Sequence, residues 1–535
     1  MSAANLAATA RDRRSLGGAI AACVALAALF VFATQPQIRK AELWEAAAWG
    51  VLLVCSFVGW GTALERLALR ERRADAGLRA IWGARALAVG GGVLSATSLF
   101  SRGAGVLLVN AGVIAFGAFV FRDRAALAER ARFALRVARA NVAMSTLLGV
   151  ALFGVALAFL GSIADPTSNP YDDDVAYLGL VKRLLQTGTL IEPFSFRRLS
   201  ALGGQTFFLA LTSLHASYRQ LNLFDRGVGF VLVAMLILGH RAGRRRVPLA
   251  LTLLLLVFLV TLPNTSINTA AHVAGFAFFL GLFRTLAWME EDRGAVRGAL
   301  PLALVAAATC TLRQNYLSGP TAMLAIAYGT RLFRKDARQL PWAVRLREPL
   351  LVAGVALVAL LPWLVLAWRS NDTFLFPLQP GTYRRAMALQ SPTFTALKEL
   401  RFLFAVGLEN EPIRVLSAIV LAGAIVRDDH PYKPLRSLWF GSAFSVLFLS
   451  HAFTLSDPGT LGRYLFGPLS ALATATVLTV GTQPLRDLRT RAAMVLCVGA
   501  MLVQIPHSRE KATKSYATMF GDIDLARRRP PPSEA

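Results

Sequence analysis

The division of the chain into apolar blocks is the sequence feature that most constrains its fold. About fifteen blocks, many of them long enough for a membrane-spanning helix, are separated by short polar connections. The composition agrees, because 55% of the residues are hydrophobic, only 16% are charged and the mean hydropathy is +0.52. This apolar content exceeds that of an ordinary soluble domain. We therefore predict an all-α fold, a polytopic transmembrane helical protein with about 13–15 spans.

The apolar blocks define the expected spans. The first block follows a basic leader and lacks a convincing cleavage site, so we expect an uncleaved anchor rather than a signal peptide. The expected spans are residues 19–33, 43–67, 86–99, 104–121, 142–163, 227–238, 249–262, 270–287, 299–312, 320–333, 350–368, 413–426, 438–453, 465–480 and 492–505. Their alternation places the N-terminus in the cytoplasm and the C-terminus outside, although the basic tail leaves its own side open.

The charge distribution argues against nucleic acid as a partner. The formal net charge is +26 and the isoelectric point is near 11.1, but the arginines and lysines lie mostly in the connections between apolar blocks. Orientation in a bilayer by the positive-inside rule explains this distribution better than a nucleic-acid surface does. The expected location is the inner (plasma) membrane. The four cysteines lie inside apolar blocks without paired spacing, which supports neither disulfides nor a metal site.

The longest polar break between apolar blocks opens with three adjacent carboxylates, Asp172, Asp173 and Asp174. Neighbouring carboxylates repel one another and raise at least one pKa, so a purely structural loop has no need of them. Residues 175–187 after them have helical spacing of apolar residues, and Gly188 is a natural stop. We expect this helix and a second short one, at 199–211, to lie at the extracytoplasmic membrane interface. The alternative is that the carboxylates only cap the first helix.

Several stretches resemble one known superfamily. DDVAYLGLVKRLLQTGTLIEP at 173–193 resembles the first outer loop of the C-type (GT-C) glycosyltransferases, the superfamily of the lipid A aminoarabinose transferases and protein mannosyltransferases. LSALGGQTFFLALTSLHASYRQLNLFDRGVGFVL, ALVAAATCTLRQNYLSGPTAMLAIAYG, WRSNDTFLFP and GRYLFGPLSAL resemble later segments of these enzymes, in the same order. The chain departs from the pattern by having four spans before the acidic loop, where one is usual. It also has Asp174 where the second acid is often Glu.

The resemblance implies a division of the chain. Residues 1–140 would form extra N-terminal helices without an assigned role, and residues 141–506 a GT-C-like catalytic domain. This domain would contain an acidic extracytoplasmic loop at 164–226 and a second extracytoplasmic loop at 369–411. Residues 507–535 would form a polar, basic tail.

The resemblance also implies an inverting transferase that moves a sugar from a polyprenyl-phosphate donor to an acceptor hydroxyl. The acceptor would be a glycan, a lipid or a protein, and the active site would face the extracytoplasmic side. Asp173 is the expected general base, since a partly desolvated carboxylate is more basic. Asp174 and Asp172 would orient the acceptor or, in a metal-dependent enzyme, bind a divalent cation such as Mg²⁺ or Mn²⁺.

Basic residues at the outer ends of the spans are the candidate ligands of the donor phosphate. We expect Arg463 and Arg313 to fill this role with Tyr464, because fixed cations stabilise the negative charge of a departing phosphate. Arginines in such places also extend towards lipid head groups, and this alternative stays open. The candidate substrate-binding residues are Tyr177, Asn371 and Arg384. The reserve cations are Arg369, Arg384 and Arg385.

Two other classes of protein remain as alternatives. A lipid-linked oligosaccharide ligase or polymerase would use diphosphate-linked donors and would not need the three aspartates. A transporter or flippase would carry acids or bases in the middle of its spans. His272 and His451 lie near the outer ends of expected spans, and we favour packing over chemistry for both.

Overall fold

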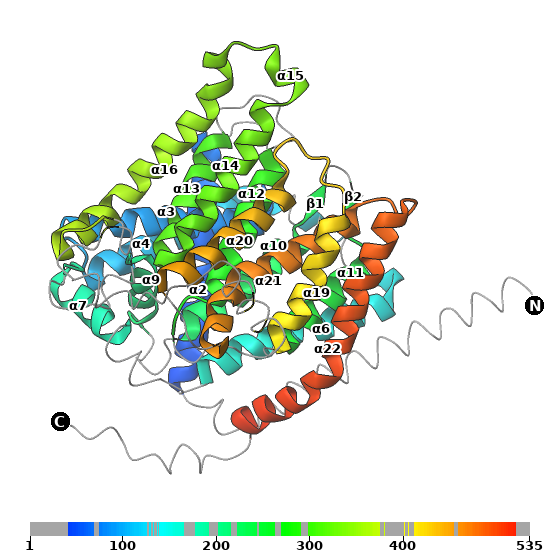
Figure 1. Ribbon diagram of the computed structural model, residues 1–535. Coiled ribbons are helices and arrows are strands. Elements are labelled where there is room, and N and C mark those ends of the chain that lie inside the picture. The colour runs from blue at the N-terminus through cyan, green and yellow to red at the C-terminus, as the bar shows by residue number, and fades with distance from the viewer. Residues whose placement is uncertain are drawn as a thin grey trace, which may run out of the picture.

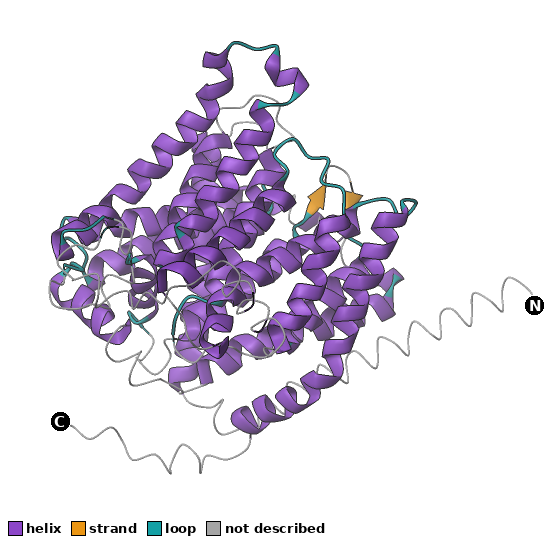
Figure 2. Ribbon diagram, in the orientation of Figure 1, coloured by secondary structure: helices purple, strands orange, loops and turns teal. Residues whose placement is uncertain are grey.

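The computed structural model describes most of the chain as helix (Figures 1 and 2). The described residues are 41–68, 74–125, 128, 129, 132, 136, 139–164, 177–191, 202–215, 222–242, 245–262, 269–289, 298–374, 379, 401, 405, 411–453 and 458–520. Within them the only sheet is a hairpin of two short antiparallel strands, β1 (Arg241–Ala242) and β2 (Arg245–Arg246). The predicted all-α class is confirmed apart from this hairpin.

The described helices follow one another in chain order. They are α2 (Ala41–Ala68), α3 (Ala76–Ala96), α4 (Arg102–Arg122), α6 (Val142–Ala164), α7 (Gly179–Thr187), α9 (Gly204–Thr212), the π-helix η3 (Leu223–Val228), α10 (Gly229–Leu238), α11 (Leu249–Thr261), α12 (Val273–Met289), α13 (Ala299–Leu312), the 3-10 helix η5 (Gln314–Tyr316), α14 (Ser318–Leu332), α15 (Lys335–Arg338), α16 (Trp342–Asn371), α19 (Glu411–Ile425), α20 (Pro434–Phe453), α21 (Pro458–Thr482) and α22 (Leu488–Phe520).

Four helical stretches of the described chain are long and apolar enough to cross a membrane. They are Glu45–Leu67 in α2, Arg102–Arg122 in α4, Trp342–Asn371 in α16 and Tyr464–Thr482 in α21. Four shorter apolar helical stretches lie in α6, α11, α12 and α13. The larger number of spans, about 13–15, stays a prediction, and the first expected span at 19–33 lies outside the described residues.

The largest differences between the observed and predicted helix boundaries are at three places. α3 begins at Ala76, because Asp75 caps its N-terminus and accepts from the backbone N–H of Gly77 at 3.0 Å. Hydropathy predicts this start ten residues later, because Arg79 and Arg85 make the preceding stretch resemble a polar connection. α16 also begins eight residues before the predicted span, and α22 runs past the predicted end at 505 into the basic tail.

The connections gather at two ends of the helical bundle. The hairpin end carries the β1–β2 hairpin, α15 and the C-terminal ends of α2, α12 and α19. The α7 end carries α7, α9, the α3–α4 connection and the turn after α13. In Figure 1, α15 lies at the top of the molecule and α7 at the lower left. Arginines and lysines are frequent at the hairpin end: Arg241, Arg245, Arg246, Arg334, Lys335, Arg338 and Arg427.

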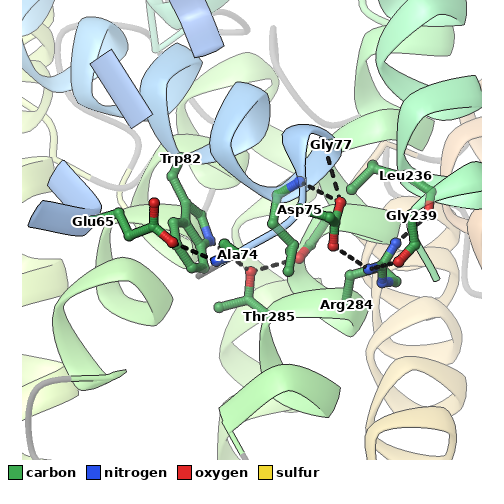
Figure 3. Close-up of polar contacts among 11 residues, drawn as sticks. Glu65, Ala74, Asp75, Gly77, Trp82, Leu236, Gly239, Arg284 and Thr285 are labelled. Carbon is green, nitrogen blue, oxygen red and sulfur yellow. Dashed lines mark hydrogen bonds and ion pairs between the residues drawn. The ribbon is translucent and has the colours of Figure 1, made fainter. Parts of the chain in front are cut away.

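Buried ion pairs join the helices at the hairpin end (Figure 3). Arg284 of α12 donates to Asp75 Oδ2 at 2.7 Å and to the carbonyl of Gly239 at 3.1 Å. Arg79 of α3 donates to Glu65 Oε2 of α2, also at 2.7 Å. The charges are thus paired where α2, α3, α10 and α12 meet, as buried charges require.

A second ion-pair network at the hairpin end centres on Glu348 of α16. Arg331 pairs with one carboxylate oxygen, and the hydroxyl groups of Tyr432 and Tyr328 donate to the other at 2.7 Å and 3.1 Å. α14, α16 and the connection between α19 and α20 are therefore held together by a fully partnered carboxylate.

The helices of the N-terminal region pack directly on the rest of the bundle. Trp82 Nε1 donates to Thr285 Oγ1 of α12 at 3.1 Å. Trp363 Nε1 of α16 donates to the carbonyl of Ala88 at 3.2 Å. The indole of Trp363 also lies against Gly203, where an added Cβ would be 2.4 Å from the ring. One indole therefore touches α3, α16 and the start of α9.

The two short helices of the α7 end match the sequence expectation in part. α7 buries Leu180, Val181 and Leu184 and ends at Gly188, whose left-handed φ of 73° lets the chain turn there. The predicted caps Asp172 and Asp173 lie outside the described residues. The second helix begins at Gly204, after Gly203 with φ of 128°, and its nine residues are too few to span a bilayer.

Candidate functional site

Buried polar side chains gather at the α7 end. They come from η3, from the residues before α12, from the turn after α13, from the start of α21 and from the residues before α7. Several of their polar atoms have no hydrogen-bond partner within the described part of the chain. Because a buried polar atom without a partner is costly, such a cluster calls for a ligand or ordered water.

Arg313 is the central cation of this cluster. It ends α13 with an extended backbone, so the chain turns sharply into η5. The residue is only 8% exposed, and its guanidinium carbon lies 4.4 Å from the centroid of the Tyr464 ring, a cation–π contact. Tyr177 and Asp225 also lie within electrostatic range of it. Its Nη1 has no hydrogen-bond partner among the described residues, so the guanidinium keeps donor capacity.

Tyr316 fixes the turn that carries Arg313. Its buried hydroxyl donates to the carbonyl of Ala271 at 2.9 Å, just before α12. Glycines make room for the ring, since a Cβ at Gly275 or Gly467 would lie 2.4 Å or 2.7 Å from the hydroxyl oxygen. α12, α21 and the turn after α13 therefore meet around one phenol.

Asp225 is the carboxylate of the cluster. It lies in η3 and is 1% exposed. Its Oδ1 accepts from the backbone N–H of Ala274 at 2.8 Å, at the positive N-terminus of α12. Burial raises the pKa of Asp225 to about 6, although the backbone N–H groups of Ala274, Val273 and His272 and the charge of Arg226 act in the opposite direction. Its Oδ2 has no hydrogen-bond partner in the described chain.

Three buried asparagines add further polar atoms at this end. Asn222, Asn315 and Asn371 are each 3% exposed or less. Within the described residues, no partner is found for Asn222 Oδ1, Asn315 Nδ2 or either amide atom of Asn371. Asn371 is the last residue of α16, and the hydroxyl of its neighbour Ser370 donates to the carbonyl of Leu190 at 3.4 Å. The end of α16 therefore lies beside the chain that follows α7.

The structure brings Tyr177, a candidate substrate-binding residue, close to Arg313 and Tyr464, two candidate ligands of the donor phosphate. Arg313 contacts Tyr464 and lies within electrostatic range of Tyr177. Asn371 lies at the same end of the bundle. Arg463 is part of α21, which begins seven residues before the predicted span at Pro458.

Arg369, one of the reserve cations, is exposed near the end of α16 and donates to the carbonyl of Ala96 at 3.5 Å. The other predicted site residues lie outside the described chain. These are Asp172, Asp173, Asp174, Arg384 and Arg385. In the part of the chain that the structure does describe, no group of three or more His, Cys, Asp or Glu side chains could hold a metal ion. The predicted metal ligands, Asp172 and Asp174, are not among those residues, so the metal hypothesis stays a prediction.

Sequence reasoning missed Asp225, Tyr316, Asn222 and Asn315. One signal was present for Asp225, because it lies with Arg226 directly before an apolar block, and charged residues in such places are seldom there for packing alone. The other three have no distinctive spacing. Only the folded arrangement shows that they meet.

Comparisons with known proteins give no relative. No family model, no curated protein and no solved structure matches this chain.

Proposed function

We propose that this chain is an integral, multi-pass membrane glycosyltransferase of the GT-C type. In this proposal it transfers a sugar from a polyprenyl-phosphate donor to an acceptor hydroxyl with inversion. The α7 end faces the extracytoplasmic side of the inner (plasma) membrane and holds the active site. The acceptor is a glycan, a lipid or a protein.

Exposed apolar helix faces and the charge asymmetry support the membrane part of the proposal. α4 exposes Leu107, Ile114 and Phe121, and α16 exposes Leu357 and Val358. Contiguous apolar surface of this kind is rare on soluble monomers, and lipid would cover it. The arginine-rich hairpin end would be cytoplasmic by the positive-inside rule. The α7 end would then be extracytoplasmic.

The observation that carries the proposal is the cluster of Arg313, Tyr464 and Tyr177. A buried guanidinium with a free donor suits a phosphate group, which accepts charge-assisted hydrogen bonds. Asp174 precedes Tyr177 by three residues, so the covalent chain keeps their Cα atoms within about 11 Å of each other. The covalent chain therefore limits how far the acidic stretch can lie from Arg313.

The proposed reaction needs a base for the acceptor and a cation for the leaving group. The acceptor oxygen attacks the anomeric carbon of the sugar as the bond from that carbon to the phosphate oxygen breaks. The bonding electron pair leaves with the lipid phosphate, and Asp173 takes the hydroxyl proton. Arg313 stabilises the negative charge that grows on the phosphate. Attack from the opposite face inverts the anomeric centre.

A transporter is the second candidate function, because one buried charge lies far from either end of a helix. Arg85 of α3 is fully buried, donates to the carbonyl of Phe278 and lies 4.6 Å from the Phe278 ring centroid. Its Nε and Nη1 have no partner among the described residues. An unpaired charge in a span is typical of a conduit. The described helices give no second such charge beside it, so the transferase proposal stands first.

Lipid analysis tests the proposal. Mass spectrometry would compare lipid extracts from cells that lack the protein with extracts from cells that carry the native chain, Asp173→Asn or Arg313→Ala. We expect a polyprenyl-monophosphate sugar to accumulate in all strains except the one with the native chain. Accumulation of a diphosphate-linked oligosaccharide would support a ligase or polymerase instead. If the lipid profiles of all four strains are identical, the transferase proposal is wrong.

A further inference from the structure

Asp225 and Arg313 form a pair of opposite charges that do not satisfy each other. Both are buried and both act electrostatically on the hydroxyl of Tyr316, which Arg313 also contacts by a hydrogen bond. Asp225 Oδ2 and Arg313 Nη1 each lack a hydrogen-bond partner among the described residues, so these two atoms are not bonded to one another. A buried acceptor and a buried donor are thus open in the same cluster.

The open atoms define the chemistry of a ligand. Arg313 Nη1 needs an acceptor, which a phosphate oxygen supplies. Asp225 Oδ2 needs a donor, which a phosphodiester does not have. A sugar joined to a phosphate presents both groups, because its hydroxyls donate hydrogen bonds close to the phosphate. An unsubstituted lipid phosphodiester would leave Asp225 unpaired, and a buried polar group without its partner is strongly disfavoured.

We infer that Asp225 recognises the donor sugar by accepting a hydrogen bond from a sugar hydroxyl, while Arg313 holds the phosphate. This inference rests on the proposed function and names the part of the donor that this carboxylate reads. The backbone N–H of Ala274 orients the group by binding Oδ1, and the backbone N–H groups of Val273 and His272 also act on the carboxylate. Oδ2 accepts no hydrogen bond among the described residues and is the atom we assign to the ligand. Asp225 is therefore a specificity residue, distinct from the base Asp173.

Matched lipid probes of equal charge test the inference. The full chain, purified in nanodiscs, would be titrated with farnesyl methyl phosphate and with the farnesyl phosphate esters of glucose, mannose, galactose and arabinose. All five are phosphodiesters, and only the last four carry sugar hydroxyls. We expect the tightest sugar ester to bind at least tenfold better than the methyl ester. Arg313→Ala should weaken both.

Asp225→Asn is the decisive variant. The amide oxygen can still accept from Ala274, but the amide nitrogen replaces the open acceptor with a donor. We expect this variant to lose the advantage of the sugar ester and to keep its affinity for the methyl ester. Asp428→Asn is the matched control at the hairpin end. Asp428 is also buried, but its Oδ2 accepts from the backbone N–H of Arg436 at 2.9 Å.

A measurement on the native chain covers the case in which Asp225→Asn does not fold. Between pH 7 and pH 5, Asp225 takes up a proton, so affinity for the sugar ester should fall. Affinity for the methyl ester should stay constant, because neither diester titrates in this range.

Different binding results would contradict the role of Asp225 and the proposed function. If both esters bind through Arg313 but the sugar adds no affinity, or if neither Asp225→Asn nor pH changes its advantage, the role of Asp225 is wrong and the proposed function survives. If neither ester binds, or if binding does not depend on Arg313, the proposed function fails and the inference falls with it.

Discussion

The two ends of the bundle differ in whether their buried charged side chains are paired. At the hairpin end, Arg284 pairs with Asp75 and Arg331 pairs with Glu348. At the α7 end, Asp225 and Arg313 are 1% and 8% exposed, and one atom of each lacks a partner in the described chain. Paired charges hold helices together, whereas an unpaired buried charge is tolerated where a ligand completes it. The comparison thus separates a structural end from a binding end.

The strongest way to sharpen this comparison is to remove the cation of the α7 end. Arg313→Ala should lower the rate of sugar transfer by about 10²–10³-fold, because a charge that stabilises the leaving group is lost. Its thermal unfolding temperature should stay close to that of the native chain. Arg414→Ala, at an exposed position of α19, is the control. An Arg313→Ala protein that transfers normally would remove Arg313 from the site.

The reverse result is expected at the hairpin end. Arg284→Ala should destabilise the fold by about 3 kcal/mol, since it breaks an ion pair and leaves the carbonyl of Gly239 without its donor. The yield of folded protein in detergent would fall, while the activity of each folded molecule would stay near normal. The exposed Arg245→Ala is the control. Equal stability of the two variants would contradict a structural role for the Arg284 pair.

Lowering the pH should change ligand affinity at the α7 end by a smaller factor. The pKa of Asp225 is raised to about 6, so its carboxylate is mostly ionised at pH 7 and mostly protonated at pH 5. We expect affinity for a sugar-bearing donor to fall about tenfold over this range, in proportion to the ionised fraction. The charged and titratable groups around Asp225 are Arg226, His272, Arg313 and Tyr316.

Protonation of Asp225 should lower ligand affinity but raise the stability of the ligand-free protein. Because the folded pKa lies above the unfolded value of 3.8, the folded state binds the proton more tightly. Its stability should therefore rise as the pH falls from 6 towards 4. Unfolding of Asp225→Asn across this range is the reference, and an identical slope in both proteins would contradict the raised pKa.

The smallest expected effect concerns the backbone of the α7 end. Gly188→Ala should cost about 1 kcal/mol, because Ala disfavours the φ of 73° that ends α7. The new Cβ would also lie 2.6 Å from the carbonyl oxygen of Ser98. Gly354→Ala in α16 is the control, since its Cβ would meet nothing within 4 Å. A lower unfolding temperature for Gly354→Ala than for Gly188→Ala would contradict this account.

The sequence predicts helices well and the cluster only in part. Hydropathy gives the bounds of α13 because its ends coincide with the ends of an apolar block. It misplaces the start of α3, because Arg79 and Arg85 are buried by partners from other helices and not by local pattern. The sequence analysis assigned Arg313 and Tyr464 to the same site, and the structure places them in cation–π contact. Asp225 was missed since its partner is a backbone N–H far along the chain, which no local spacing reveals.

The position of Trp363 makes its indole ring an intrinsic probe for nuclear magnetic resonance. Its indole touches α3, the start of α9 and its own helix α16, so any movement of α9 against the bundle would change the surroundings of one ring. Fluorine-labelled tryptophan would give this ring a resolvable nuclear resonance, assigned by Trp363→Phe. Ligand-induced displacement at the α7 end could then be followed without attaching a label to the site itself.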